Sequence, residues 1–190
     1  FTDIGKTIFL TKEEAEKETL DMLNVYKTFF EDYLAIPVLA GRKTEKEKFA
    51  GAEYTYTIEA LMYNGICLQS GTSHYFGQKF SKAYDIKFLN KNNETEYAYQ
   101  TSWGTSTRLI GAVIMAHGDN RGLKLPPRVA PIQVVIVPVA ANKPGVIEKA
   151  TELYSSLKQT ARVELDDRMQ YSPGYKFNYW EMKGVPIRVE

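Results

Sequence analysis

The chain has 190 residues, of which 44% are hydrophobic and 13% aromatic, so it can bury a core in one domain or in two small ones. Lysine and arginine number 24 against 23 aspartates and glutamates, which excludes a bulk charge signal for nucleic acid and leaves any RNA contact to local patches. Cys67 is the only cysteine, which excludes an internal disulfide and a cysteine-based zinc cluster and fits a reducing compartment. The composition and the single cysteine lead us to expect a globular cytoplasmic protein. No apolar run approaches the roughly 20 residues of a membrane span, so we expect no membrane partner.

After residue 10 the pattern predicts a long amphipathic helix. Thr11 and Glu14 have the spacing of a capping box, and apolar residues keep helical spacing until Pro37 prevents the helix from continuing. A strand is expected at residues 36–40. The charged segment that follows, residues 41–48, is most simply a solvated loop.

Two β-hairpins are expected next. Residues 53–62 alternate with a period of two and end at the Asn-Gly pair of residues 64–65, a strong tight-turn signal. The chain should therefore return as a strand through residues 66–69. A second hairpin is predicted from residues 84–89 and 96–102, joined by a polar turn.

The following helix is apolar and carries an arginine in its first turn. Its start is capped by Thr105, Ser106 or Thr107. Its buried face is expected to hold Leu109, Ile110, Val113 and Ile114. Arg108 begins the helix, where unpaired backbone N–H groups attract anions, and Gly118 ends it. This arrangement suits phosphate binding, although a capped helix with an early arginine and no site is also common.

From Pro131 onward the pattern changes to alternating strands and helices. Strands are expected at residues 133–139, 161–165 and 185–189, and helices at residues 144–158 and 175–182. A βαβαβ order implies a small parallel or mixed sheet. We therefore expect two domains, residues 1–131 and residues 132–190.

Three runs of the sequence resemble one family, in one order along the chain. The first is WGTSTRLIGAVIMAHGDNRGLKLPPRVAPIQVVIVPV, which begins at Trp103 and resembles motif 3 and the following domain junction of prolyl-tRNA synthetases of the archaeal and eukaryotic type. The others are GRKTEKEKFAG at residues 41–51 and LQSGTSHYFGQKFSKAYDIKF at residues 68–88. The resemblance implies an α+β fold, in which the C-terminal half of an antiparallel class II synthetase catalytic sheet precedes a small α/β anticodon-binding domain. It also implies that the chain is part of a longer protein.

The chemistry of that family explains which residue types recur in it. The carboxylate of L-proline attacks the α-phosphate of ATP, and the resulting prolyl-adenylate is transferred to proline tRNA. Negative charge stays on phosphoryl oxygens throughout, so fixed cations and hydrogen-bond donors are needed. The resemblance further implies ATP and Mg²⁺ as cofactors and a homodimer as the assembly.

At the nucleotide end, the resemblance assigns four residues. Arg108 corresponds to the motif 3 arginine and is expected to bind ATP and to take part in catalysis, through a planar guanidinium that stacks and donates hydrogen bonds at once. Gln69 and Thr72 correspond to positions that contact ATP and its magnesium, with Gln69 as the candidate for the metal. Ser106 corresponds to a nucleotide-contacting hydroxyl, and its role as a helix cap is equally plausible from the pattern.

At the amino-acid end, the resemblance assigns Phe49, His74 and Trp103 to a rigid slot that suits the pyrrolidine ring. From the pattern alone, Phe49 is a core residue and His74 a hydrogen-bonded structural histidine.

The front of the chain departs from the family. Family members carry a motif 2 arginine and then a run of the form Trp-x-Glu-x-His-Thr-x-His, whereas TDIGKTIF stands here and only Thr7 matches. The segment is misaligned, joined from elsewhere across a gap, or part of a diverged site. Without the motif 2 arginine, this chain is not expected to activate proline unaided.

Two classes of function follow. The first is a proline–tRNA ligase, and the second is a synthetase-like tRNA-binding or regulatory protein without proline activation. The first is favoured because a decayed site has no physical reason to keep the four separated polar groups of Gln69, Thr72, His74 and Arg108.

The last third of the chain carries candidates for RNA contact. Basic residues that could meet phosphates are Lys143, Lys149, Lys158, Arg162, Arg168, Lys176, Lys183 and Arg188. Aromatic residues that could stack on unpaired anticodon bases are Tyr171, Tyr175, Phe177, Tyr179 and Trp180. Helical spacing makes several of these aromatics core residues instead, so exposed lysines and arginines are the stronger candidates.

Overall fold

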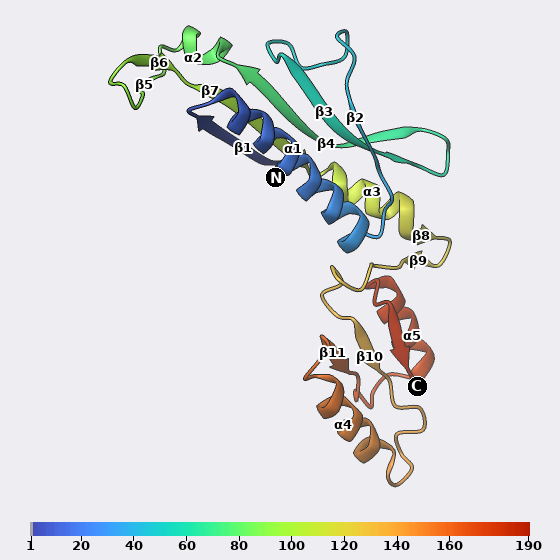
Figure 1. Cartoon of the computed structure of the whole chain (residues 1–190). Helices are drawn as coiled ribbons and strands as arrows, with labels where there is room; N and C mark the ends of the chain where they lie inside the picture. Colours follow the sequence, from blue (N-terminus) through green and yellow to red (C-terminus); the bar gives the residue numbers. More distant parts are fainter. Residues whose placement is uncertain (1) are drawn as a thin grey trace. The chain divides into compact units, whose positions relative to one another are not determined.

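A computed structural model describes residues 2–190 of the chain, with side chains from residue 5 onward (Figure 1). The chain divides between Ala112 and Val113 into two compact units. Among the described residues, no helix combines the length and the apolar character needed to cross a membrane.

The first unit is built on an antiparallel sheet of five strands in the order β1-β7-β4-β3-β2. The strands are β1 (Thr2–Phe9), β2 (Leu39–Arg42), β3 (Tyr54–Leu61), β4 (Cys67–Gly77) and β7 (Tyr99–Ser106). Together with the helices described below, this sheet confirms the α+β class predicted for the catalytic portion.

The predicted long helix is confirmed as α1 (Lys12–Thr28), which lies along one face of the sheet (Figure 1). Its capping box is present, because the Thr11 hydroxyl accepts from the N–H of Glu14 and the Glu14 carboxylate accepts from the N–H of Thr11, both at 3.2 Å. The last turn widens into a π-helix, η1 (Phe29–Tyr33), which the periodicity did not predict. The expected strand also starts later, at Leu39, since Pro37 has no N–H to give to a ladder.

The Asn-Gly hairpin is confirmed as the connection of β3 to β4, and Gly65 adopts a φ of +79° that favours glycine. The second hairpin is shorter than predicted. It consists of β5 (Lys87–Leu89) and β6 (Thr95–Tyr97) and follows the short helix α2 (Lys79–Ala83). The expected strand of residues 96–102 breaks at the buried Ala98, after which β7 joins the large sheet.

The helix after β7 is α3 (Arg108–His117), with the predicted start and end; the two-residue strands β8 (Gly118–Asp119) and β9 (Gly122–Leu123) follow it. The expected buried face is wrong in part. Ile110 and Ile114 are 63% and 51% exposed, while Ala112 and Val113 are buried. The buried stripe is therefore rotated around the helix, because the run is apolar on more than one side and periodicity alone does not choose between sides.

The second unit confirms the βαβαβ order. Its elements are β10 (Val134–Ile136), α4 (Val146–Leu157), β11 (Val163–Leu165), α5 (Pro173–Met182) and β12 (Ile187–Val189). The three strands form a wholly parallel sheet in the order β11-β10-β12. Val135, Val137 and Trp180 form the centre of its core.

Candidate active site

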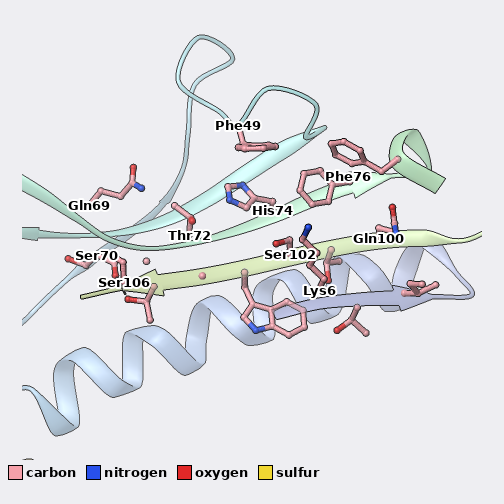
Figure 2. A pocket seen from close by; sticks show the side chains of 18 of the residues that line it. Lys6, Phe49, Gln69, Ser70, Thr72, His74, Phe76, Gln100, Ser102 and Ser106 are labelled. Carbon is pink, nitrogen blue, oxygen red and sulfur yellow. Dashed lines mark hydrogen bonds between the residues drawn. The ribbon is translucent and has the colours of Figure 1, made fainter. Parts of the chain in front are cut away.

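A cavity of about 780 Å³ opens on the first unit's sheet, on the face away from α1 (Figure 2). Strands β1, β4 and β7, the loop before β3, helix α2 with the segment after it, and the start of α3 contribute its lining residues. All the site residues assigned by resemblance are among them: Phe49, Gln69, Thr72, His74, Trp103, Ser106 and Arg108. The volume falls within the range of about 300 to 1,000 Å³ that small-molecule sites occupy.

A β-bulge explains how Gln69 and Thr72 share this cavity. Residues three apart on a regular strand point to opposite faces. Here Ile58 pairs with Gly71 while Glu59, the next residue, pairs with Gln69, so one residue of β4 is extra. The bulge reverses the alternation and allows both side chains to line the same cavity, as Figure 2 shows.

Arg108 is fixed at one end of the cavity by two hydrogen bonds. Its backbone N–H donates to the Ser106 hydroxyl at 3.3 Å, so Ser106 supplies the cap expected for the helix. Its guanidinium Nη1 donates to the main-chain carbonyl of Gln69 at 3.1 Å. A guanidinium has five N–H donors, so further donors remain for an anionic ligand. We call the part of the cavity lined by Gln69, Thr72, Ser106 and Arg108 the nucleotide end, after the ligand that the sequence predicts for these residues.

Aromatic rings gather in a second part of the cavity, which we refer to as the aromatic end. The ring of Phe49 lies 5.2 Å from that of His74 and 5.9 Å from that of Phe76, centroid to centroid, and Phe80 lies 4.8 Å from Phe76. Phe49 is 50% exposed, so it is not the core residue that the pattern alone suggested. Such a group offers apolar ring faces at spacings typical of aromatic contacts.

His74 is held as a neutral imidazole. Its Nδ1 lies 2.9 Å from the Thr55 hydroxyl. Burial lowers the pKa of His74 below its usual 6.5, and the nearby ammonium of Lys43 lowers it further. The aromatic end therefore presents no positive charge from His74 at neutral pH.

An NMR titration of the His74 imidazole is expected to give a midpoint below pH 6.5. Because the folded-state pKa lies below the unfolded value, His74 favours the folded state above about pH 6.5, and this contribution is lost as the pH falls through the folded pKa. His74→Gln should remove that part of the pH dependence of unfolding. A midpoint above 6.5 would contradict the burial and charge that we assign to the ring.

Trp103 differs from the other assigned residues in the direction of its side chain. Ser102 pairs with His74 across β7 and β4, whereas Trp103 pairs with Ser73, so alternation turns the indole to the opposite face of the sheet. There it covers Gly5 of β1, where any Cβ would lie 2.2 Å from the indole Cε2. Its role as a wall of the proline pocket stays a prediction.

The front strand adds residues that the sequence did not identify as part of the site. Lys6 pairs with Ser102, and Figure 2 shows the two side chains next to each other in the cavity. Among the described lining residues, Lys6 and Arg108 are cations and none is an aspartate or glutamate. The cavity consequently favours an anionic ligand. Lys6 was missed because its place depends on the long-range pairing of β1 with β7.

No group of three or more histidine, cysteine, aspartate or glutamate side chains in the described part of the chain is placed to hold a metal ion. The side-chain oxygen of Gln69 accepts a hydrogen bond from the Lys43 ammonium. It therefore does not fit as a direct Mg²⁺ ligand in this arrangement, because two cations would compete for one oxygen.

A buried acid organises the second unit. Asp166 is 3% exposed and accepts hydrogen bonds from Arg168 at 2.7 and 2.8 Å and from the Trp180 indole N–H at 2.8 Å. Burial alone opposes ionisation, but these donors outweigh it and hold the pKa of Asp166 at about 2. Lys176, expected to meet RNA phosphates, is instead 3% exposed and donates to the Asp166 carbonyl at 2.9 Å. That expectation is wrong, because helical spacing turns Lys176 toward the core.

Asp166→Asn is expected to lower the free energy of unfolding of the second unit by roughly 3 to 5 kcal/mol, the usual loss when one partner of a buried ion pair is removed. Urea unfolding followed by the NMR signal of the Trp180 indole N–H measures it. The neighbouring Asp167 is exposed, so Asp167→Asn should change the stability by less than about 0.5 kcal/mol. If Asp166→Asn lowers the free energy of unfolding no more than Asp167→Asn does, the Asp166 cluster does not stabilise this unit.

The fold and the cavity together define a class of protein: a class II tRNA synthetase core followed by an anticodon-binding unit. Residues 1–117 match the family model described as the tRNA synthetase class II core domain (G, H, P, S and T), and residues 133–190 match the anticodon binding domain. The chain belongs to the class II tRNA synthetase core family, and the predicted fold class is confirmed.

Within this class, similar proteins include proline–tRNA ligases. Those of Alkaliphilus oremlandii and Clostridium novyi are 62% and 61% identical to this chain over 98% of its length. A crystal structure of prolyl-tRNA synthetase from Cryptosporidium parvum, complexed with L-proline and AMP, is 44% identical, with a TM-score of 0.90 over 98% of this chain and 41% of that one. The chain spans 39% of the length of each of the two bacterial relatives.

Proposed function

We propose that this chain is a part of a proline–tRNA ligase that contributes to the pocket for L-proline and ATP, together with an anticodon-binding domain. The protein would activate L-proline with ATP to prolyl-adenylate and transfer the prolyl group to proline tRNA. The observation that carries the proposal is the single cavity in which aromatic rings stand at one end and Arg108 at the other. An amino acid joined to a nucleotide needs both ends at once.

Each end has a role in the proposed reaction. At the aromatic end, Phe49 and the neutral His74 would enclose the pyrrolidine ring, with Trp103 supporting the sheet behind them or closing the pocket. At the nucleotide end, Thr72 and Ser106 would contact the nucleotide and Arg108 would stabilise charge on the phosphoryl oxygens as carboxylate attack proceeds. The L-proline and AMP bound to the Cryptosporidium parvum relative support this division.

We further propose the properties that the resemblance implies beyond the pocket. Mg²⁺ would be carried on the ATP phosphates rather than on Gln69, whose oxygen does not fit as a ligand. The protein would be a cytoplasmic homodimer. It would be of the archaeal and eukaryotic type, for which the support is the 44% identity to the Cryptosporidium parvum protein, although the bacterial relatives are more similar, at 62% and 61% identity. We place the domain boundary near Pro131, between residues 1–131 and 132–190; the gap between the two family matches, after residue 117 and before residue 133, supports it.

For the anticodon-binding unit, we propose that exposed basic residues meet proline tRNA. Lys143, Lys158 and Lys183 are the candidates, because all three are exposed. Arg168 is not a candidate, because it pairs with the buried Asp166. Tyr175 is 49% exposed and stacks with Tyr171 at 4.4 Å between ring centroids, which supports a base-stacking surface there.

The alternative, a synthetase-like tRNA-binding or regulatory protein without proline activation, is favoured by one observation. Lys6 stands directly before Thr7, where the family run has histidine, and no acidic side chain among the described lining residues is available to pair with the ammonium of proline. This alternative predicts a cavity that binds a nucleotide but not the amino acid.

A crystal structure with L-proline and AMP added together distinguishes the two functions. The proposed ligase should show proline between Phe49 and His74 and AMP against Arg108. AMP alone in the cavity would support the binding protein, and an empty cavity at saturating ligand would contradict both.

A further inference from the structure

Lys43 is the first residue after β2, and its surroundings differ from those of Lys46 in the same charged segment. Its main-chain N–H donates to the carbonyl oxygen of Thr55 at 2.8 Å, which fixes it against β3. Its side chain is 16% exposed, whereas Lys46, three residues further along the chain, is exposed to solvent. Withdrawing an ammonium from water is unfavourable unless polar partners replace the lost hydration.

Two side chains from the adjacent strands supply these partners. The Lys43 ammonium donates a hydrogen bond to Oε1 of Gln69, and Oε1 of Glu59 lies 3.9 Å from its Nζ. Glu59 and Gln69 are direct cross-strand partners at the edge of the bulge that turns Gln69 toward the cavity. Lys43 therefore holds the strand pair together at the point where the alternation changes.

Gln69 is consequently held at both of its acceptor groups. Its main-chain carbonyl accepts from the guanidinium of Arg108, and its side-chain oxygen accepts from Lys43. With the side-chain oxygen engaged, the two N–H donors of the amide remain for another acceptor. Gln69 lines the cavity and Lys43 does not, so Lys43 is hydrogen-bonded to the cavity wall through Gln69. Its charge also lowers the pKa of His74, which burial already keeps neutral.

We propose that Lys43 is a positioning residue for the nucleotide end of the cavity: it holds the side-chain oxygen of Gln69 so that the amide N–H groups are presented to acceptor atoms of the nucleotide. The proposal rests on the proposed function, because it deepens the assignment of the ATP site. Lys43 itself makes no contact with the ligand. Its partner Glu59 balances the charge and limits the positions that the ammonium can take.

The test uses the full-length protein and compares Lys43→Met with Lys46→Met, which removes the same charge from an exposed position of the same segment. We expect Lys43→Met to raise the KM for ATP about tenfold in ATP–pyrophosphate exchange, because the charge-assisted hydrogen bond from Lys43 orders the amide N–H groups of Gln69. The KM for proline should stay within about twofold of the wild-type value. Lys43→Arg should restore part of the ATP affinity. The side-chain amide NMR signals of Gln69 should move in Lys43→Met and stay in place in Lys46→Met.

The outcomes separate this inference from the proposed function. A wild-type protein without any proline-dependent exchange would refute the proposed function. The inference about Lys43 would still be tested by titrating AMP into wild type and Lys43→Met while following the side-chain amide NMR signals of Gln69. Active wild type with both KM values unchanged in Lys43→Met, or raised equally, would overturn the inference. If Lys43→Met loses its cooperative thermal transition, Lys43→Gln, which keeps a polar group in the half-buried position, takes its place under the same criteria.

Discussion

Arg108→Ala is expected to lower proline-dependent ATP–pyrophosphate exchange of the full-length protein by about 30-fold to nearly 1,000-fold. A charge-assisted contact to a phosphoryl oxygen inside a protein site is worth roughly 2 to 4 kcal/mol, and each 1.36 kcal/mol corresponds to about tenfold in rate. The hydrogen bond to the carbonyl of Gln69 holds the guanidinium at the nucleotide end of the cavity before any ligand arrives. Little of this energy is therefore lost in ordering the side chain.

Two further variants make the Arg108 result specific. Arg108→Lys keeps the charge without the planar fork, and we expect it to recover only part of the lost rate. Arg121→Ala removes an exposed arginine outside the cavity and should leave exchange unchanged. Exchange by Arg108→Ala within threefold of the wild-type rate would exclude the role that we give to Arg108.

Deletion of residues 133–190 is expected to reduce aminoacylation of proline tRNA steeply while exchange continues. Neutralisation of each phosphate by a lysine or arginine releases counterions, so loss of several contacts reduces RNA affinity by orders of magnitude at moderate salt. In the proposed function, adenylate formation would use the cavity of the first unit, and none of its lining residues lies in the deleted segment.

This comparison requires a folded remainder. Circular dichroism should retain the thermal transition of the first unit, and exchange within about threefold of the full-length rate confirms an intact cavity. Retained charging of proline tRNA by such a folded variant would show that residues 133–190 do not carry the recognition we assign to them.

Local signals in the sequence predicted much of the fold. Thr11 and Glu14 lie within one helical turn, and the turn at Gly65 requires only a positive φ, so both could be identified without knowledge of the rest of the chain. The βαβαβ order after Pro131 was also predictable from local signals, because short apolar strand segments alternate there with segments of helical spacing.

The remaining features depend on contacts between distant residues. Alternation along β4 would place Gln69 and Thr72 on opposite faces, and only the pairing with β3 reveals the bulge that brings them together. Lys6 enters the cavity because it pairs with Ser102 of β7, 96 residues further along the chain, a contact that no local pattern contains. Lys176 was taken for a surface residue because burial of a lysine requires a partner, and here that partner is the carbonyl of Asp166, in the loop after β11 and 10 residues earlier in the chain.

The most direct test of the account is ATP–pyrophosphate exchange by the full-length protein with each of the twenty amino acids in turn. The aromatic end of the cavity and the cationic nucleotide end predict exchange that depends on L-proline, with much lower rates for the other amino acids. Absence of exchange with L-proline, or a faster rate with another amino acid, would contradict the assignment of this cavity to proline activation.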